Sequence, residues 1–559
     1  MNRRVAGFLL GFVGIVLAYW LVMRFIQNPE IDSLPYYTFR TLLRITLTLA
    51  ISLVWGITFG ILASTNRIAS LVLIPFIDLL QSIPILGYFP AVIMLLISMF
   101  KASELAIELA AIVLLFTSMA WAIFFGVVGA VKAIPANVVE SSKTFGLKGY
   151  SYVRHVILPA IAPAVVAGAC LAWCDGWFFM IAAEYIQYAG TAYSVPGLGM
   201  YLAKASYVYN DLTLAVVLLA LITALVLYIN SFTWHTLMDR ATRGTYKPLV
   251  RLDLSGVGQL GIVKNLGVRR WLHVGDRIHW PRSLSAASQR LRRYSRLEKA
   301  IAVVLVMSIV ASGIVAASRR LPSLDTIRKG LSDPPADELG RLPMYVALTM
   351  GRLGIAYVVS LVLALAMGVL AAENKKFAAI FYPMYDVGQA VPILALFPVM
   401  FKILSGIFGR TVGLELTAIT VLVLDMIWYM FLNVVSAVKN IPSELNEVGL
   451  IFGLRGLRKV THLVIPAILP AIVTGSLLSW GTGWNTIIYS EYMPYESAEN
   501  GKPLAVAGLG SYLSRAGYEY GNTVLLVLLL GIMAAIVLSM EGLVWRRLLR
   551  KFERYRMEA

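Results

Sequence analysis

The stretch VKAIPANVVESSKTFGLKGYSYVRHVILP, residues 131–159, is a polar, helix-compatible segment between two strongly apolar ones, and it occurs twice. The second copy, residues 438–466, reads VKNIPSELNEVGLIFGLRGLRKVTHLVIP. A shift of 307 positions superimposes the copies, and the match continues without a gap to residue 186, with about 25 of 56 positions identical. Identity at one fixed spacing over this length is far above chance, so the chain contains an internal duplication.

The composition indicates a polytopic membrane protein. Apolar residues make up 59% of the 559 residues, charged residues only 14%, and the mean hydropathy is +0.77. A soluble chain of this length has no way to bury so much apolar surface. The long segments are apolar on every side and about 20 residues in length, which predicts spanning helices. A β-barrel would alternate apolar and polar residues at every second position.

The net charge of +18 has two explanations: a nucleic-acid partner, or basic residues gathered on the cytoplasmic side of a membrane. The second is favoured in a chain of this hydropathy. Residues 239–296 hold thirteen Lys or Arg against three Asp, which predicts a cytoplasmic linker. Such a run can bind RNA or anionic lipid headgroups, but a solvated linker is the simplest interpretation.

Neither the cysteines nor the N-terminus suggests a secreted protein. Cys170 and Cys174 lie one helical turn apart in an apolar segment, so we expect helix packing rather than a disulfide framework or a metal cluster. The apolar run Val5–Met23 is too long for a signal peptide and has no small-residue cleavage site after it. We therefore predict a retained first span that starts inside.

The apolar segments predict six spans in each half, and so an all-α membrane protein with two tandem six-helix units. The units are residues 1–238 and 297–559, joined by the linker 239–296. The first half spans the membrane at residues 5–26, 38–64, 69–99, 105–131, 157–187 and 210–234. The second half spans it at residues 298–318, 343–372, 376–404, 412–438, 463–493 and 522–546.

Two spans of the first half, the third and the fifth, are expected to be long and interrupted. Pro84 removes a backbone donor near the middle of the third span, which predicts a kink or a break there. Between the fifth and sixth spans, residues 188–210 are predicted to be an outside loop folded against the membrane. Gly56 and Gly60 form a GxxxG pattern that predicts close packing against another helix.

An even number of spans places both halves in the membrane the same way up, related by a pseudo-two-fold axis along the membrane normal. Both copies of the duplicated loop and both termini are then cytoplasmic. Segment 319–342 is placed outside, because four acidic residues dilute its basic ones. An inverted repeat would put the two loops on opposite faces.

The duplicated segment resembles the EAA loop of ABC importer permeases. The pattern is Glu-Ala-Ala, three residues, Gly, nine residues and Ile-x-Leu-Pro. The first copy has Glu140-Ser-Ser, Gly146 and Val156-Ile-Leu-Pro159, and the second has Glu447-Val-Gly, Gly453 and Leu463-Val-Ile-Pro466. The alanines and the Ile are replaced by small or apolar residues, whereas the Glu–Gly spacing and the final Pro are kept.

The resemblance implies that each loop is a short helix that fits a cleft on an ATPase subunit, with Gly146 and Gly453 at the turn between two short helices. The alternative is a surface helix without a partner. Eight residues are assigned to this coupling: Glu140, Gly146, Gly149, Pro159, Glu447, Gly453, Gly456 and Pro466.

The same resemblance implies partners for this chain. No Gly-x-x-x-x-Gly-Lys-Ser/Thr motif occurs, so we expect two copies of a separate cytoplasmic ATPase to carry ATP and Mg²⁺. This chain itself is expected to hold no cofactor or metal and to be no enzyme. A substrate-binding protein outside and the cytoplasmic membrane of a prokaryote are also implied.

Flanking motifs resemble those of nitrate, sulfonate, taurine and bicarbonate permeases. They are QSIPILGYFP at 81–90, QAVPILALFP at 389–398, and Gly-Trp with Glu eight positions after the Gly at 176–184 and 483–491. The chain looks like a fused, duplicated version of such anion permeases. A fused iron or thiamine permease is an alternative, and so is an ion-coupled twelve-span carrier, although such a carrier would lack the docking loop.

Intramembrane charges are costly and therefore mark candidate functional residues. Arg44 and Arg352 correspond at a shift of 308, as do Asp78 and Asp386. The arginines either attract an anion to the axis or form buried Arg–Asp pairs that lock two helices, and we favour the pairs.

Other residues are candidates for the substrate path. Trp177, with Asp175 and Glu184 on nearby turns, is the proposed gate, whereas Trp173 and Trp480 are expected to pack in the core. In the second copy Asp175 becomes Thr482, so the two walls differ chemically. The remaining candidates are Gln81, Pro84, Gln389, Pro392, Trp484, Asn485 and Glu491.

Overall fold

A computed structural model describes two halves of the chain with gaps. The described residues are 3–26, 28, 30–100, 104–188, 191–209, 211–234, 236–237, 240–241, 330, 336–496, 503–545, 547–548 and 551. The predicted span at 298–318, nearly all of the linker 239–296 and most of segment 319–342 lie outside these residues. Their predicted placements therefore remain predictions, as do the domain boundaries.

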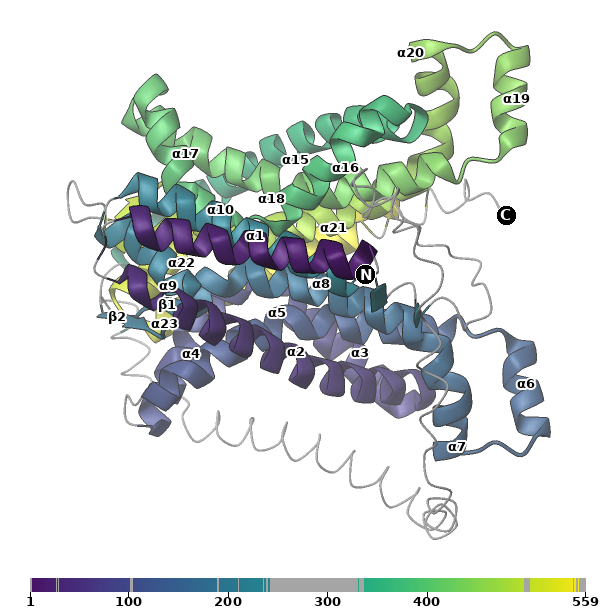
Figure 1. Ribbon diagram of the computed structural model, residues 1–559, viewed down its shortest axis with the longest axis horizontal. Coiled ribbons are helices and arrows are strands. Elements are labelled where there is room, and N and C mark those ends of the chain that lie inside the picture. Colours follow the sequence, from purple (N-terminus) through teal and green to yellow (C-terminus); the bar gives the residue numbers. More distant parts are fainter. Residues whose placement is uncertain are drawn as a thin grey trace.

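The first half is a helical bundle with one small hairpin (Figure 1). Its helices are α1 (Arg3–Phe25), α2 (Leu34–Thr65), α3 (Arg67–Ser82), α4 (Ile85–Phe100), α5 (Glu104–Lys132), α6 (Ala136–Thr144), α7 (Tyr150–Tyr152), α8 (Leu158–Glu184), α9 (Leu198–Ala203) and α10 (Leu212–Ile229). Strands β1 (Tyr185–Tyr188) and β2 (Thr191–Ser194) pair antiparallel between α8 and α9. Short π-helical turns follow α7, α9 and α10, at Val153–Ile157, Lys204–Val208 and Asn230–Trp234.

The described part of the second half repeats this order. Its helices are α15 (Leu342–Glu373), α16 (Lys375–Ala390), α17 (Ile393–Phe408), α18 (Arg410–Lys439), α19 (Ser443–Ile451), α20 (Gly456–Lys459), α21 (Ile465–Glu491), α22 (Leu509–Ser514) and α23 (Thr523–Met540). Strands β3 (Tyr492–Glu496) and β4 (Pro503–Ala505) form the matching hairpin. Among the described residues, eight helices are long and apolar enough to cross a membrane.

The third span of each half is broken, as predicted from its proline. In the first half α3 ends at Ser82 and α4 begins at Ile85, and in the second half α16 ends at Ala390 and α17 begins at Ile393. The expected interruption of the fifth span is wrong, because α8 continues from Leu158 to Glu184 with Pro163 inside it. Pro163 removes one backbone donor but does not end the helix.

The described residues of the segment 188–210 also do not form the predicted loop. The β1–β2 hairpin opens the segment, and α9 follows with all six of its residues buried. Burial of backbone away from water requires paired N–H and C=O groups, and both the hairpin and the short helix provide such pairing. The segment is thus a packed part of the bundle.

Helices α2 and α5 approach closely at the GxxxG pattern, which confirms the expected packing there. A Cβ atom on Gly56 would lie 2.6 Å from Ile123 Cγ2, and one on Gly60 would lie 2.7 Å from Val127 Cγ1. In the second half Gly368 on α15 meets Val434 of α18 in the same way, at 2.7 Å. Small residues at these positions let the backbones of the two helices come together.

The two copies of the duplicated segment project from the same end of the bundle. Figure 1 shows α6 and α7 at one corner and α19 and α20 at another corner of that end. This arrangement agrees with a parallel, not an inverted, repeat. The hairpins and α9 lie toward the opposite end, so each half carries one projecting helix pair and one hairpin followed by a buried short helix.

Candidate functional site

Each projecting pair, which we call a lever, is a helix, a glycine turn and a second short helix. The first lever comprises α6 and α7, and the second comprises α19 and α20. Gly146 follows α6 with φ +71°, and Gly453 follows α19 with φ +69°. A positive φ is readily adopted only by glycine, with Asn the next most tolerant residue.

The turn after each lever helix is a Schellman motif. Gly146 N–H donates to the Lys143 carbonyl at 3.0 Å, and Leu147 N–H donates to the Ser142 carbonyl at 3.0 Å. The second lever repeats both bonds, from Gly453 and Leu454. These bonds satisfy the last carbonyls of the helix and turn the chain sharply, which confirms the predicted role of both glycines.

The levers are joined to long spans without a flexible break. After α7 the chain passes through a π-helical turn directly into α8, in which Pro159 stands in the first turn. Pro466 occupies the same position in α21. The coupling candidates Glu140 and Glu447 are both exposed on their lever helices. A force on either lever is therefore passed into one continuous helix of the bundle.

The opposite end of the bundle holds a buried charge network in each half. In the first half Arg44 of α2 donates from Nε and Nη2 to both carboxylate oxygens of Glu108, each at 2.9 Å, and from Nη1 to Glu184. Thr41 Oγ1 donates to Glu184 at 2.7 Å and accepts from Leu198 N–H at 2.8 Å. Gly199 N–H donates to Glu184 at 2.6 Å.

The second half has the same network with corresponding residues. Arg352 of α15 donates to both oxygens of Glu415 at 2.7 Å and to Glu491 at 2.7 Å. Thr349 donates to Glu491 at 2.7 Å and accepts from Leu509 N–H at 2.8 Å, and Gly510 N–H donates to Glu491 at 2.8 Å. The Glu184 and Glu491 residues are each only 1% exposed. Each network ties a buried short helix, α9 or α22, to three long spans.

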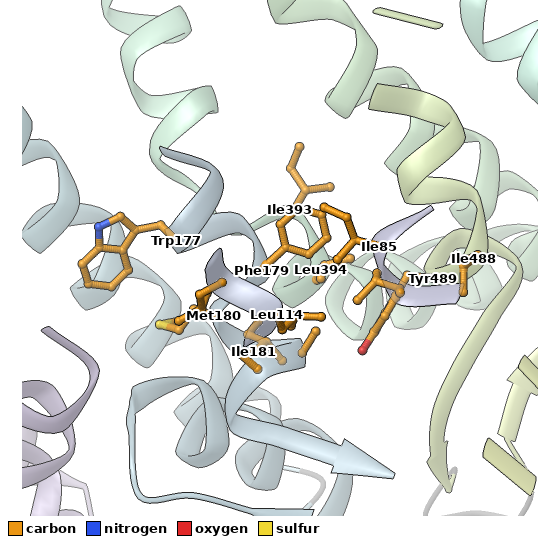
Figure 2. Close-up of a cluster of buried hydrophobic side chains, with 14 of the residues drawn as sticks. Ile85, Leu114, Trp177, Phe179, Met180, Ile181, Ile393, Leu394, Ile488 and Tyr489 are labelled. Atoms are coloured by element: carbon orange, nitrogen blue, oxygen red, sulfur yellow. The ribbon is translucent and has the colours of Figure 1, made fainter. Parts of the chain in front are cut away.

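The two halves meet in an apolar contact where α4 and α17 begin. Figure 2 shows Ile85 of α4, Ile393 and Leu394 of α17, and Phe179 of α8 grouped together, with Ile488 and Tyr489 of α21 nearby. All six side chains are buried. The first turn of α4 also has polar anchors in the second half, since Asn485 Oδ1 accepts from Ile85 N–H at 3.3 Å and Tyr518 donates to the Leu86 carbonyl at 3.1 Å.

The comparison with known families agrees with this architecture. The family of binding-protein-dependent transport system inner membrane components matches residues 52–244 and 363–554, one match in each half and together more than half of the chain. The chain belongs to this family. The two matches also confirm that the permease is duplicated.

Individual relatives are more distant. A nitrate import permease protein of Leptolyngbya laminosa is 25% identical over 148 residues, which are 26% of this chain and 50% of that protein. A bicarbonate transport system permease protein of Synechococcus elongatus is 26% identical over 201 residues, 35% of this chain and 67% of that protein. A taurine transport system permease protein of Escherichia coli is 27% identical over 164 residues, 29% of this chain and 57% of that protein.

The prediction that Arg44 and Arg352 pair with aspartates is wrong. Arg44 is bound by Glu108 and Glu184, and Arg352 by Glu415 and Glu491. The reason is geometric: α5 and α8 bring their carboxylates to Arg44, and α18 and α21 bring theirs to Arg352. Two carboxylates surround each arginine, so the site offers no free positive charge to an anion. The side chains of Asp78 and Asp386 lie outside the described residues.

Trp177, the expected gate, is buried in the bundle, and its role as a gate stays a prediction. Trp177 is 1% exposed and packs edge-on against Trp173, with ring centroids 6.0 Å apart. Figure 2 shows its ring set apart from the group formed by Phe179 and the starts of α4 and α17. Asp175 is half-buried on the same helix. Trp173 and Trp480 are buried, which confirms their expected place in the core.

Some of the other candidates for the substrate path lie where the two halves meet. Trp484 is buried, and Asn485 contacts α4 as described above. Pro84 and Pro392 stand directly before α4 and α17, at the two breaks. Gln81 and Gln389 are half-buried on α3 and α16, one turn before those breaks. The structure therefore brings Pro84, Pro392 and Asn485 to the contact between the halves, whereas the arginine networks lie apart from it.

Sequence reasoning missed four residues of the networks: Thr41, Glu108, Thr349 and Glu415. The signal was present, because Glu108 and Glu415 correspond at the repeat shift of 307, and Thr41 and Thr349 correspond at the 308 of the arginines. A search for every polar residue that recurs at the repeat spacing would have found them.

A second polar cluster lies near the start of α2. Lys204 Nζ donates to Glu30 at 2.8 Å, Tyr209 donates to it at 2.9 Å, and Tyr37 at 3.1 Å. Burial raises the pKa of Glu30, but these hydrogen bonds and the Lys204 charge together hold the pKa below its usual value. In the second half Arg515 and Tyr345 bind Glu338 in the same manner. These clusters tie the ends of α2 and α15 to the turns after α9 and α22.

One test of the buried network uses Gly508. A Cβ atom there would lie 2.2 Å from Glu491 Oε2, and that carboxylate is held by Arg352, Thr349 and Gly510. We expect Gly508→Ala to lower the free energy of unfolding of the permease by about 1–3 kcal/mol, since the carboxylate has no room to move. Gly351→Ala is the control, because nothing lies within 4 Å of its added Cβ. Equal thermal stability of the two variants in detergent would contradict the packing.

Proposed function

We propose that this permease is the membrane subunit of an ATP-driven importer, fused from two six-span units, and that it moves a small anion. The two levers face the cytoplasm, where each docks into one ATPase subunit. A binding protein on the other side delivers the substrate. The nitrate, bicarbonate and taurine permeases among the relatives support the class of substrate.

The observation that carries this proposal is the pair of exposed levers at one end of the bundle. Each combines a surface helix, a Schellman turn and a direct connection into a long span. A rigid push on such an element moves a whole helix rather than a loop. An ion-coupled carrier needs no such element, so the levers favour a partner that hydrolyses ATP outside this chain.

The mechanism follows from the contact between the halves. When the ATPase subunits close, the levers approach each other and α8 and α21 move with them. Phe179, Ile488 and Tyr489 lie on those two helices, so the motion separates these three side chains from Ile85 and Ile393. The substrate path then opens on one side and closes on the other as the halves rock. During this motion the arginine networks keep α9 attached to the first half and α22 attached to the second half.

The proposal is tested by reconstituting the permease in liposomes with the ATPase subunit and the binding protein that co-purify with it. We expect ATP hydrolysis to rise when the binding protein is loaded with one of nitrate, bicarbonate or taurine, and uptake of that ion to require ATP. Iron and thiamine serve as comparison substrates. Uptake driven by a proton or sodium gradient without ATPase would contradict the proposal, and stimulation by iron or thiamine alone would correct the substrate.

A further inference from the structure

The two levers expose different surfaces although their backbones are alike. At three successive exposed sites of the repeat the first lever has polar residues and the second has apolar ones. The pairs are Ser141 and Val448, Lys143 and Leu450, and Thr144 and Ile451. The next site is phenylalanine in both, Phe145 at 82% exposed and Phe452 at 76%.

The second lever therefore exposes large apolar side chains on both sides of its glycine turn. Leu450 is 60% exposed, Ile451 81% and Leu457 82%. Exposed apolar side chains grouped on one surface mark a site of protein or membrane contact. In the first lever the corresponding sites carry Ser141, Lys143 and Thr144, so its surface before Phe145 is polar, whereas the basic site beyond the turn is shared, as Lys148 and Arg455.

We propose that the levers dock unequally, and that the α19–α20 lever provides most of the apolar contact that holds the ATPase on this permease. This inference rests on the proposed function, and the occupant is the ATPase subunit. Opposite α19 the ATPase needs an apolar groove that accepts Leu450, Ile451 and Phe452. Opposite α6 it needs a groove for one phenylalanine with an acidic group at its rim, which complements Lys143.

The position of the lever favours a protein occupant over lipid. Figure 1 shows α19 standing beyond the end of the bundle, separated from the spanning helices by the turns at its two ends. Glu444 and Glu447 are exposed on the same helix as Leu450 and Ile451. On α19 itself the exposed charges beside the tip are acidic, which disfavours contact of this helix with an anionic lipid surface, whereas the exposed basic residues Arg455 and Arg458 lie beyond the turn. Burial in a protein groove removes the apolar tip from water and leaves the carboxylates at the rim.

The test exchanges the three differing residues between levers. Val448→Ser, Leu450→Lys and Ile451→Thr together give the second lever the tip of the first. Ser141→Val, Lys143→Leu and Thr144→Ile together make the reverse change. The ATPase subunit that co-purifies with the native chain is removed, added back to purified permease in nanodiscs, and its Kd is measured. An unchanged elution volume and tryptophan emission verify that each variant is folded.

We expect the first exchange to raise the Kd at least about tenfold, because it removes most of the apolar contact. The reverse exchange is expected to lower the Kd and to weaken its dependence on salt, since Lys143 is lost. Equal changes of Kd from Phe145→Ala and Phe452→Ala, with no effect of the exchanges, would overturn the inference and leave the proposed function standing. If no ATPase co-purifies at all, the proposed function fails with it. Loss of binding to anionic vesicles without a change in ATPase affinity would assign the tip to lipid instead.

Discussion

Replacing Glu491 with alanine is expected to lower the free energy of unfolding of the permease by about 3–5 kcal/mol, because it leaves Arg352 buried with an incomplete set of partners. Glu491 accepts hydrogen bonds from Arg352, from Thr349 and from the backbone of Gly510. Its side chain is fully buried. Loss of the carboxylate also frees the start of α22, so we expect β3, β4 and α22 to detach from the bundle first.

Thermal or denaturant unfolding in detergent, followed by tryptophan emission, measures this effect. Glu491→Gln keeps an acceptor for Gly510 and is expected to cost less than the alanine variant. Glu444→Ala is the control, because Glu444 is an exposed carboxylate at the start of α19. A Glu491→Ala protein as stable as the Glu444→Ala protein would show that the network contributes no stability. The same comparison at Glu184 tests the first half.

Replacing both turn glycines, Gly146 and Gly453, with valine is expected to reduce ATP-driven uptake at least about tenfold while the bundle stays folded. Both have a positive φ, +71° and +69°, which a β-branched residue adopts only with strain. The turn would then open, and each lever helix would point away from its ATPase. Nothing lies within 4 Å of a Cβ added at either position, so no steric clash accompanies the change.

Asparagine at the same two positions is the matched control, since it tolerates the left-handed conformation far better than valine does. We expect the asparagine variant to retain most of the uptake. The measurement is uptake into liposomes together with the amount of ATPase bound. If valine and asparagine variants transport equally well, the geometry of the turn does not matter for coupling and the lever mechanism is wrong.

Much of the fold was predictable because it depends on local patterns. Span lengths follow from runs of apolar residues, and the break before α4 follows from Pro84 in an apolar run. The levers followed from one segment that recurs with its glycines in place. The hairpin after α8 was missed because its strands are only four residues long, too short for their alternation to be distinguished from a loop.

The candidate site was less predictable, and the arginines show why. Arg44 was recognisable as a buried charge in need of a partner, but its partners lie 64 and 140 positions away in the sequence. The closest acidic residue in the next predicted span was Asp78, and this proximity along the chain misled the prediction.

The sequence by itself determined that this is a duplicated membrane permease, where its third span breaks, and which residues turn its levers. Each of these depends on composition, on the spacing of apolar residues or on a repeat, and all three can be read from the linear sequence. Only the tertiary structure decided which carboxylates neutralise Arg44 and Arg352, that α9 and α22 are buried, and that α4 packs on α21 and α17 on α8 across the halves. These depend on which helices pack at the same depth, and that is set by contacts between residues far apart in the chain.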